Sequence, residues 1–345
     1  MPKRSFVSLR LLLAACVLPL IAGVASCVST PTPTPTVAAV IQQPLLLEDR
    51  AVMSDGYVLP IRRWAPEQAP RAVVLGLHGF NDYHQAFAAV GPKLAAHGIV
   101  TYAYDQRGFG ATELRGYWAG AEHLIEDTRT LVRLLRQRHP DLPIYLLGES
   151  MGGAVGLATV AAEPLPLVDG VVLAAPAVWA RRTMPWYQRA ALSVARRVAP
   201  DWRPTGRSLG KVASDNREML LAMGRDPLVI KETRIDTVAG LADLMDLALD
   251  SAPRLNTPAL LLYGERDEIV PKRPTCSMLN ALPDRQRVDW RLALYPDGYH
   301  MLTRDLQGDK VIEDIAQWIL DRTAPLPSGH EAVRADWDTR VCGAA

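Results

Sequence analysis

Hydrophobic positions after residue 70 form short uninterrupted runs instead of an alternating pattern. These runs cover residues 72–77, 99–104, 144–147, 170–175, 259–263 and 292–295. Strands that are buried on both faces have this uniform apolar pattern, and the longer helical stretches between the runs are of the length that parallel strands need as connections. The pattern therefore predicts an α/β protein with a mostly parallel central sheet and helices on both faces.

A hairpin and several helices complete the predicted framework. Residues 45–53 and 57–64 are strand-like on either side of Ser54-Asp55-Gly56, whose residue types accept the backbone angles of a tight turn. The last helix is expected to begin near Asp309. The other clear helical periods cover residues 86–97, 121–138 and 152–162.

The first residues have the layout of a secretory signal peptide. Lys3, Arg4 and Arg10 precede an uncharged apolar run over residues 11–25. A helix that crosses a bilayer needs roughly 20 apolar residues, and this run is shorter, so export is favoured over a retained anchor. Residues 1–26 are therefore predicted to be a cleaved leader.

Cys27 follows Val24-Ala25-Ser26, and this tetrapeptide resembles the lipobox of bacterial lipoproteins. The resemblance implies that Cys27 is acylated as a lipid anchor, and an ordinary cleavage site that happens to precede a cysteine is the alternative. Residues 27–44, which contain a Pro-Thr repeat, are predicted to be a linker. Val28 stands where an inner-membrane retention signal has Asp, which implies an outer-membrane lipoprotein facing the periplasm. A secreted soluble protein or an inner-membrane anchor is the alternative.

Composition and charge exclude several classes of protein. Hydrophobic residues make up 49% of the 345 residues and charged residues 22%, which is typical of globular proteins and not of disordered chains or membrane-helix bundles. The formal charge of +1 argues against a nucleic-acid partner. Once Cys16 leaves with the leader and Cys27 is acylated, Cys276 and Cys342 remain, and they are predicted either to form a disulfide or to stay separate thiols.

A nucleophile elbow is predicted where residues 144–147 meet the following helix. The sequence Gly148-Glu149-Ser150-Met151-Gly152 matches G-x-S-x-G, in which the tight turn needs flanking glycines and lifts the serine to the carboxyl edge of the sheet. A structural Gly-Ser turn is the alternative. The strand before the motif and the helix after it favour Ser150 as a catalytic nucleophile.

A serine hydroxyl is a weak nucleophile at neutral pH, so Ser150 requires a histidine base and a carboxylate that orients the base. His300 follows the last predicted strand, and Asp267 follows the strand before it, which gives the chain order nucleophile, acid, base. Glu265 and Glu268 are the competing carboxylates. We therefore predict a triad of Ser150, Asp267 and His300.

Two backbone N–H groups are candidates for an oxyanion hole. Met151 directly follows the nucleophile, and Phe80 lies in His78-Gly79-Phe80-Asn81-Asp82 after the strand at residues 72–77. His78, beside Gly79 on this turn, is predicted to brace the loop and not to act as a base. No metal-ligand cluster or dinucleotide-binding glycine pattern is present, so no metal and no cofactor is predicted.

Taken together, five motifs resemble the α/β-hydrolase superfamily. They are His78-Gly79, Asp105-Gln106-Arg107-Gly108-Phe109-Gly110, the elbow, Gly264-x-x-Asp267 and Gly298-Tyr299-His300. Within the superfamily, roughly residues 45–320 are similar to the monoacylglycerol lipase and lysophospholipase branch, which is also grouped with serine aminopeptidase-like hydrolases. The resemblance implies the α/β-hydrolase fold over residues 45–325, followed by a tail at 326–345.

The resemblance also implies roles for individual segments. Asp105 and Arg107 would brace a loop, and a helical cap inserted at about residues 177–252, before the acid-bearing strand, would cover the acyl pocket. Two features depart from the pattern, namely Glu149, where animal monoacylglycerol lipases have histidine, and Phe80-Asn81-Asp82 in the oxyanion loop. Asp226 is expected to end a cap helix without a catalytic role.

The cap sequence combines a basic charge with exposed aromatic candidates. Residues 181–234 hold twelve Lys or Arg against five Asp or Glu, and an amphipathic helix is predicted around Tyr187 and Val198. This surface is expected to face anionic lipid head groups, with Trp179, Trp186 and Trp202 as interfacial aromatics. Solvated arginines whose stems cover apolar surface are the alternative.

The sequence thus predicts a serine hydrolase that cleaves esters of lipid-like substrates, monoacylglycerol or lysophospholipid, through an acyl-enzyme. An aminopeptidase or amidase, or a thioesterase or acyltransferase, would use the same triad. A lipid-binding lipoprotein with a dormant triad is the alternative without enzymatic activity. The expected partners are a small lipid or ester substrate and a membrane surface.

Overall fold

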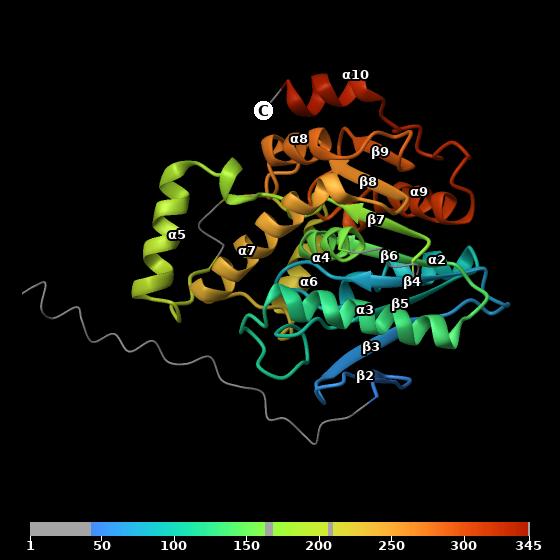
Figure 1. The fold of residues 1–345 in the computed structure, drawn as a ribbon, viewed down its shortest axis with the longest axis horizontal. Coiled ribbons are helices and arrows are strands. Elements are labelled where there is room, and N and C mark those ends of the chain that lie inside the picture. Colours follow the sequence, from blue (N-terminus) through green and yellow to red (C-terminus); the bar gives the residue numbers. More distant parts are fainter. Residues whose placement is uncertain (1–42, 163–167, 206–209, 344–345) are drawn as a thin grey trace, which may run out of the picture.

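The computed structural model describes residues 43–162, 168–205 and 210–343, and one sheet forms the centre of this part of the chain (Figure 1). Its strands are β1 (Leu45–Leu46), β2 (Arg50–Val52), β3 (Val58–Trp64), β4 (Ala72–Leu77), β5 (Ile99–Tyr104), β6 (Ile144–Glu149), β7 (Gly170–Ala174), β8 (Ala259–Gly264) and β9 (Trp290–Tyr295). They are ordered β1-β2-β3-β5-β4-β6-β7-β8-β9. All pairs from β5 to β9 are parallel, whereas β1, β2 and β3 add an antiparallel edge.

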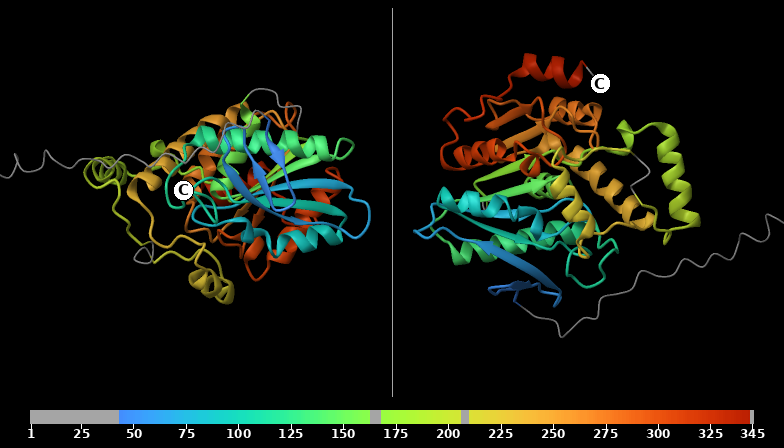
Figure 2. Two further views of the ribbon diagram at one scale, coloured as in Figure 1. Left: turned by 90° about the horizontal axis from the view of Figure 1, so that it is seen from below. Right: turned by 180° about the vertical axis from the view of Figure 1, so that it is seen from behind.

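Helices cover both faces of this sheet (Figure 2). One face packs against α2 (Val90–Ala96) and α9 (Gly308–Leu320), and the other against α3 (Ala121–Arg138), α4 (Met151–Ala161), α7 (Ile235–Ser251) and α8 (Lys272–Ala281). Successive strand side chains point to opposite faces, so Val74 joins the first core and Val73 and Leu75 join the second. This burial on both sides explains the uninterrupted apolar runs and confirms the predicted parallel α/β architecture.

Three local predictions differ from the structure. The segment 45–53 is not one strand, because the chain turns between β1 and β2, where Leu47 N donates to Arg50 O at 2.8 Å. The helix expected at 86–97 divides into the 3₁₀ turn η1 (His84–Phe87) and α2. In addition, α9 is not the last helix, since α10 (Arg334–Trp337) and the π-helical η6 (Asp338–Cys342) follow it.

The predicted C-terminal tail packs onto the domain. Trp337 and Val341 are buried, and Glu331 forms an isolated antiparallel bridge to Ala293 of β9. A disulfide joins Cys276 of α8 to Cys342 of η6, with an Sγ–Sγ distance of 2.01 Å. Of the two states that the sequence allowed for these cysteines, the structure contains the bridge.

The segment between β7 and β8 lies at the end of the sheet toward which the parallel strands point (Figures 1 and 2). It contains η2 (Arg181–Thr183), α5 (Trp186–Val198), α6 (Arg217–Arg225), α7 and η4 (Ala252–Arg254). Most of α7 is buried, and it contacts α4 of the core, whereas α5 has no buried residue. The outer part of the predicted cap is therefore formed by α5 and α6.

The predicted leader, Cys27 and nearly all of the linker lie outside the described residues. Within residues 43–162, 168–205 and 210–343, none of the helices has both the length and the apolar character needed to cross a membrane.

Candidate active site

Ser150 lies in a sharp turn between β6 and α4. Its backbone angles are φ 54° and ψ −114°, a conformation that side chains with a Cβ rarely adopt. A Cβ at Gly148 would lie 2.3 Å from the Gly152 carbonyl oxygen, and one at Gly152 would lie 1.9 Å from the Leu77 carbonyl oxygen. The turn therefore requires glycine on both sides of the serine, as the predicted elbow demands.

His300 and Asp267 form a buried hydrogen-bonded pair. His300 Nδ1 lies 2.8 Å from Asp267 Oδ2, while Asp267 Oδ1 accepts hydrogen bonds from the backbone N–H groups of Ile269 and Val270 at 2.7 and 2.9 Å. The carboxylate is thus fixed in place and orients the imidazole ring. Because Nδ1 donates to the carboxylate, Nε2 is left to accept a proton.

The environment of His300 favours a base that binds its proton firmly. Burial lowers the pKa of His300, but the charge of Asp267 and the hydrogen bond to it raise this pKa more, so the net direction is upward. A raised pKa makes the ring a stronger proton acceptor. It also means that, as the pH is lowered, the neutral and active form of His300 is protonated at a higher pH than a free histidine would be.

The competing carboxylates have other partners. Glu265 is paired with Arg340 of η6, and Glu268 accepts a hydrogen bond from Val212 N at 3.0 Å. Among the described residues, Asp267 alone forms a hydrogen bond with the His300 ring. The geometry thus selects Asp267 from the three carboxylates that the sequence placed on this loop.

The loops of Ser150 and His300 meet through their neighbours. Thr303 Oγ1 donates to Glu149 Oε2 at 3.2 Å, and Glu149 directly precedes Ser150. Within the described residues no hydrogen bond joins the Ser150 hydroxyl directly to His300. Catalytic hydrogen bonds are often long in free enzymes and shorten when substrate binds, so this arrangement is compatible with a nucleophile and base pair.

The predicted oxyanion loop lies beside the elbow. A Cβ at Gly79 would be 3.5 Å from the Ser150 Cβ, and the chain turns at Asn81 with a φ of 67°. The Phe80 ring packs edge-to-face on Phe109 at 5.6 Å between centroids, which fixes this part of the loop. The other predicted donor, Met151, directly follows Ser150 and is the first residue of α4, so its N–H has no carbonyl of a preceding helical turn to bond.

His78 holds the oxyanion loop and has no free ring nitrogen. Its Nδ1 lies 2.8 Å from the Gly79 carbonyl oxygen, and its Nε2 accepts from Gln106 N at 2.9 Å. Burial lowers the pKa of His78, which keeps the ring neutral. These contacts agree with the predicted bracing role.

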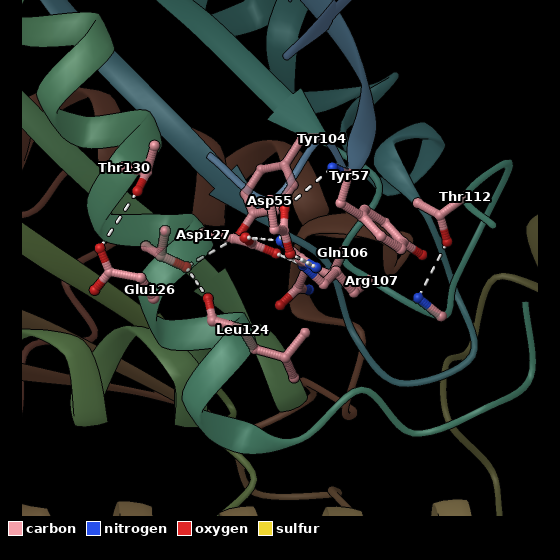
Figure 3. Close-up of polar contacts among 12 residues, drawn as sticks. Asp55, Tyr57, Tyr104, Gln106, Arg107, Thr112, Leu124, Glu126, Asp127 and Thr130 are labelled. Carbon is pink, nitrogen blue, oxygen red and sulfur yellow. Dashed lines mark hydrogen bonds and ion pairs between the residues drawn. The ribbon is translucent and has the colours of Figure 1, made fainter. Parts of the chain in front are cut away.

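Arg107 has a similar bracing function on the loop after β5 (Figure 3). Its guanidinium donates to Asp127 of α3 at 2.6 and 2.9 Å and to Asp55 of the hairpin turn at 2.6 and 3.0 Å. It also lies 4.2 Å from the centroid of the Tyr57 ring. Asp105 accepts hydrogen bonds from His84 N and Ala111 N. Asp105 and Arg107 therefore both stabilise the loop, as the resemblance implied.

Comparison with known proteins places this geometry in a family. The model of the family described as "Serine aminopeptidase, S33" matches residues 68–307, which is more than half of the chain. The chain belongs to this family. The matched region contains the elbow, the Asp267 loop and His300.

Several relatives of this chain are named as lipases. The chain is 28% identical over 269 residues to a monoacylglycerol lipase of Mycolicibacterium smegmatis, a match that covers 74% of this chain and 91% of the relative. It is 27% identical over 296 residues to the monoglyceride lipase of Mus musculus, covering 81% and 92% of the two chains.

Solved structures show the same fold. A soluble variant of the monoglyceride lipase of Saccharomyces cerevisiae is similar with a TM-score of 0.66 at 20% identity, covering 86% of this chain and all of that one. A monoacylglycerol lipase of Paleococcus ferrophilus gives a TM-score of 0.63 at 22% identity, covering 76% and 98%. The α/β-hydrolase fold is thereby confirmed, and the chain is a monoacylglycerol lipase-like α/β-hydrolase.

The sequence did not reveal a buried ionic cluster that includes Glu149, the residue before Ser150. Arg304 of η5 (Leu302–Arg304) pairs with both Glu149 and Asp82. In a neighbouring contact, Asp305 accepts from Ser214 Oγ at 2.6 Å and from Tyr299 N at 2.7 Å. No motif marks these residues, and the only signal in the sequence was Glu149 as a departure from the animal lipases.

The structure also changes the interpretation of the basic cap. Arg181, Arg182 and Arg196 pair with acidic residues of α7. This helix begins directly after residues 181–234, the segment with the excess of basic residues. When the count is extended over residues 181–254, the excess of basic residues falls to +4. Three of the arginines expected to face lipid are therefore neutralised within the protein.

Apolar side chains nevertheless remain exposed on the cap. Trp186 and Trp202 have exposed fractions of 73% and 62%, and Tyr187, Val194 and Val198 are also exposed.

The Asp226 side chain accepts from Leu228 N after α6 and from the Tyr83 hydroxyl, at 2.8 and 2.6 Å. It ends a cap helix as expected and in addition fastens that helix to the core.

Among the described residues, no group of three or more His, Cys, Asp or Glu side chains is arranged to hold a metal ion.

Proposed function

We propose that this protein is a serine hydrolase of carboxylic esters whose substrates are single-chain acyl lipids, monoacylglycerol or lysophospholipid. The observation that carries the proposal is the buried His300–Asp267 pair at 2.8 Å, which leaves Nε2 to act as a base, in a loop that Thr303 joins to Glu149 of the Ser150 elbow. The lipid class is suggested by the relatives, which are named as monoacylglycerol and monoglyceride lipases and, in Bacillus subtilis, as a phospholipase.

The proposed reaction begins with attack of Ser150 Oγ on the ester carbonyl carbon. His300 Nε2 takes the hydroxyl proton, and Asp267 stabilises the imidazolium that forms. The N–H groups of Phe80 and Met151 donate to the oxyanion of the tetrahedral intermediate. His300 then returns the proton to the leaving alcohol, which departs as the carbon–oxygen bond breaks and leaves an acyl-Ser150.

Water completes the cycle. His300 takes one proton from the water as its oxygen attacks the acyl carbonyl carbon, and a second tetrahedral intermediate forms at the same N–H groups. Collapse of this intermediate breaks the bond to Ser150 Oγ, which recovers its proton from His300. The products are a carboxylic acid and an alcohol, and no cofactor is consumed.

A side-by-side substrate panel tests the proposed class. It comprises p-nitrophenyl esters of increasing chain length, monoacylglycerol, lysophospholipid and aminoacyl amides. We expect hydrolysis of the esters and of at least one lipid, with little cleavage of the amides. A preference for aminoacyl amides would instead indicate an aminopeptidase, whereas the absence of both fluorophosphonate labelling and substrate turnover would indicate a dormant triad.

We also propose that the mature protein is anchored in the bacterial cell envelope through acylated Cys27. Several acyl chains would hold it stably, because each buried methylene contributes about 0.8 kcal/mol and one chain holds only marginally. The linker would then place the hydrolase at the membrane surface, where the exposed Trp186 and Trp202 could contact lipid.

The anchor is tested by metabolic labelling with palmitate. The wild-type protein is expected to carry the label and to sediment with membranes, whereas Cys27→Ala should carry none. Cys16→Ala is the matched control and should label like the wild type. Equal labelling of Cys27→Ala and the wild type would exclude this anchor.

A further inference from the structure

The guanidinium of Arg304 joins the segments that surround the candidate active site. Its Nη2 donates to Glu149 Oε1 at 2.7 Å, and its Nη1 donates to Asp82 Oδ2 at 2.7 Å. Glu149 directly precedes Ser150, Asp82 belongs to the oxyanion loop, and Arg304 itself follows His300 by four residues. One side chain therefore connects the loops of the nucleophile, the oxyanion donors and the base.

These contacts are buried and mutually supported. The Arg304 side chain is 7% exposed, and those of Glu149 and Asp82 are each 5% exposed. Thr303 adds a second hydrogen bond to Glu149, and the Arg304 carbonyl accepts from Asn216 Nδ2 of the cap at 3.0 Å. Buried ion clusters are a weak source of stability, because each charge loses its hydration, but two short hydrogen bonds from one planar group fix distances well.

The cluster also acts on the electrostatics of His300. Burial lowers the pKa of this histidine, while Asp267 and Glu149 raise it and Arg304 lowers it. These groups come from the loop after β8, from β6 and from η5, respectively. Arg304 thus offsets part of the negative charge that Glu149 places beside the base.

We propose that Arg304 is a positioning residue for ester hydrolysis, which holds the His300 loop against the Ser150 elbow and balances the charge of Glu149. The inference rests on the proposed function, because it assumes that His300 activates Ser150. It adds a residue that touches none of the reacting atoms.

The test measures kcat, KM and the pH dependence of kcat/KM on a short p-nitrophenyl ester. For Arg304→Met we expect kcat to fall by about 10²-fold with KM little changed, because misplacement by about 1 Å has effects of this size. The acidic limb of the profile should move to higher pH. Glu149→Gln keeps an acceptor for the guanidinium but removes the charge, so its acidic limb should move to lower pH.

Matched variants separate positioning from general destabilisation. Arg107 is also buried between two carboxylates, but it connects the hairpin turn to α3. Arg107→Met should lose stability without moving the acidic limb. Arg304→Lys keeps the charge without the planar fork, so its acidic limb should stay near the wild-type position while kcat remains reduced.

A second titrating group is controlled for directly. Burial raises the pKa of Asp305 to about 6, and Asp305 accepts from Tyr299 N beside His300. The profiles are therefore also measured with Asp305→Asn in every variant. The opposite shifts of Arg304→Met and Glu149→Gln should persist in that background.

Defined outcomes overturn the inference. Full kcat in a folded Arg304→Met, or limbs that move in the same direction for Arg304→Met and Glu149→Gln, would show that Arg304 does not position the base. If Arg304→Met does not fold, full kcat in Arg304→Lys, or an acidic limb of Glu149→Gln that does not move to lower pH, overturns the inference. If Ser150→Ala keeps wild-type activity, the proposed function fails, whereas a need for Ser150 without any effect at Arg304 defeats this inference alone.

Discussion

Replacement of Ser150 by alanine is expected to lower kcat for ester hydrolysis by about 10⁶-fold and to abolish labelling by a fluorophosphonate. The reason is that alanine removes the hydroxyl that would form the acyl-enzyme, on an elbow whose Glu149 is hydrogen-bonded to Thr303 of the His300 loop. Steady-state kinetics and gel-based labelling measure the two effects.

The control for this variant is Ser193→Ala. Ser193 is exposed on α5, so its loss should leave kcat and labelling at wild-type values. Unfolding curves of both variants should match the wild type closely, because neither change removes a core contact. Substantial turnover by Ser150→Ala would contradict the assigned nucleophile.

Removal of the disulfide is expected to lower the free energy of unfolding by about 4 kcal/mol. Cys276 and Cys342 are separated by 66 residues, and breaking the bridge releases a loop of that length in the unfolded chain. Urea unfolding of Cys276→Ala/Cys342→Ala against the wild type measures the difference. The exported location proposed above is compatible with such a bridge.

Reduction provides the matched control for the disulfide. The wild type in a strong reductant should unfold like the double variant, and the double variant should not respond to the reductant. A wild type that is no more stable than the double variant would show that the native contacts of Trp337 and Val341 hold the C-terminal segment without help from the bridge.

Much of the framework could be predicted from the chain because burial on both faces leaves a distinct sequence pattern. The parallel strands were recognised as apolar runs, and the elbow was recognised because glycine is sterically required at Gly148 and Gly152. The short helices after α9 were missed. They are only a few residues long, and they are held by contacts with α8 and β9 and not by their own periodicity.

The charge of the cap shows where counting along the chain fails. Arg181 is 65 residues from Asp246, yet its Nη1 lies 2.5 Å from Asp246 Oδ2 in the structure. A sum of charges over residues 181–234 includes Arg181 but omits its partner Asp246. The expectation of a basic lipid-facing surface was therefore too simple. Of the three tryptophans expected at the interface, Trp186 and Trp202 are exposed, whereas Trp179 packs against the core.

The sequence by itself determined the α/β architecture, the elbow at Ser150 and the candidate acid and base, because local spacing and the order of strands dictate these features. Only the tertiary structure decided that Asp267 holds His300, that Cys276 bonds to Cys342, and that one guanidinium bridges three loops. Each of these depends on residues distant in the chain that meet at one end of the sheet, and no local pattern records such a meeting.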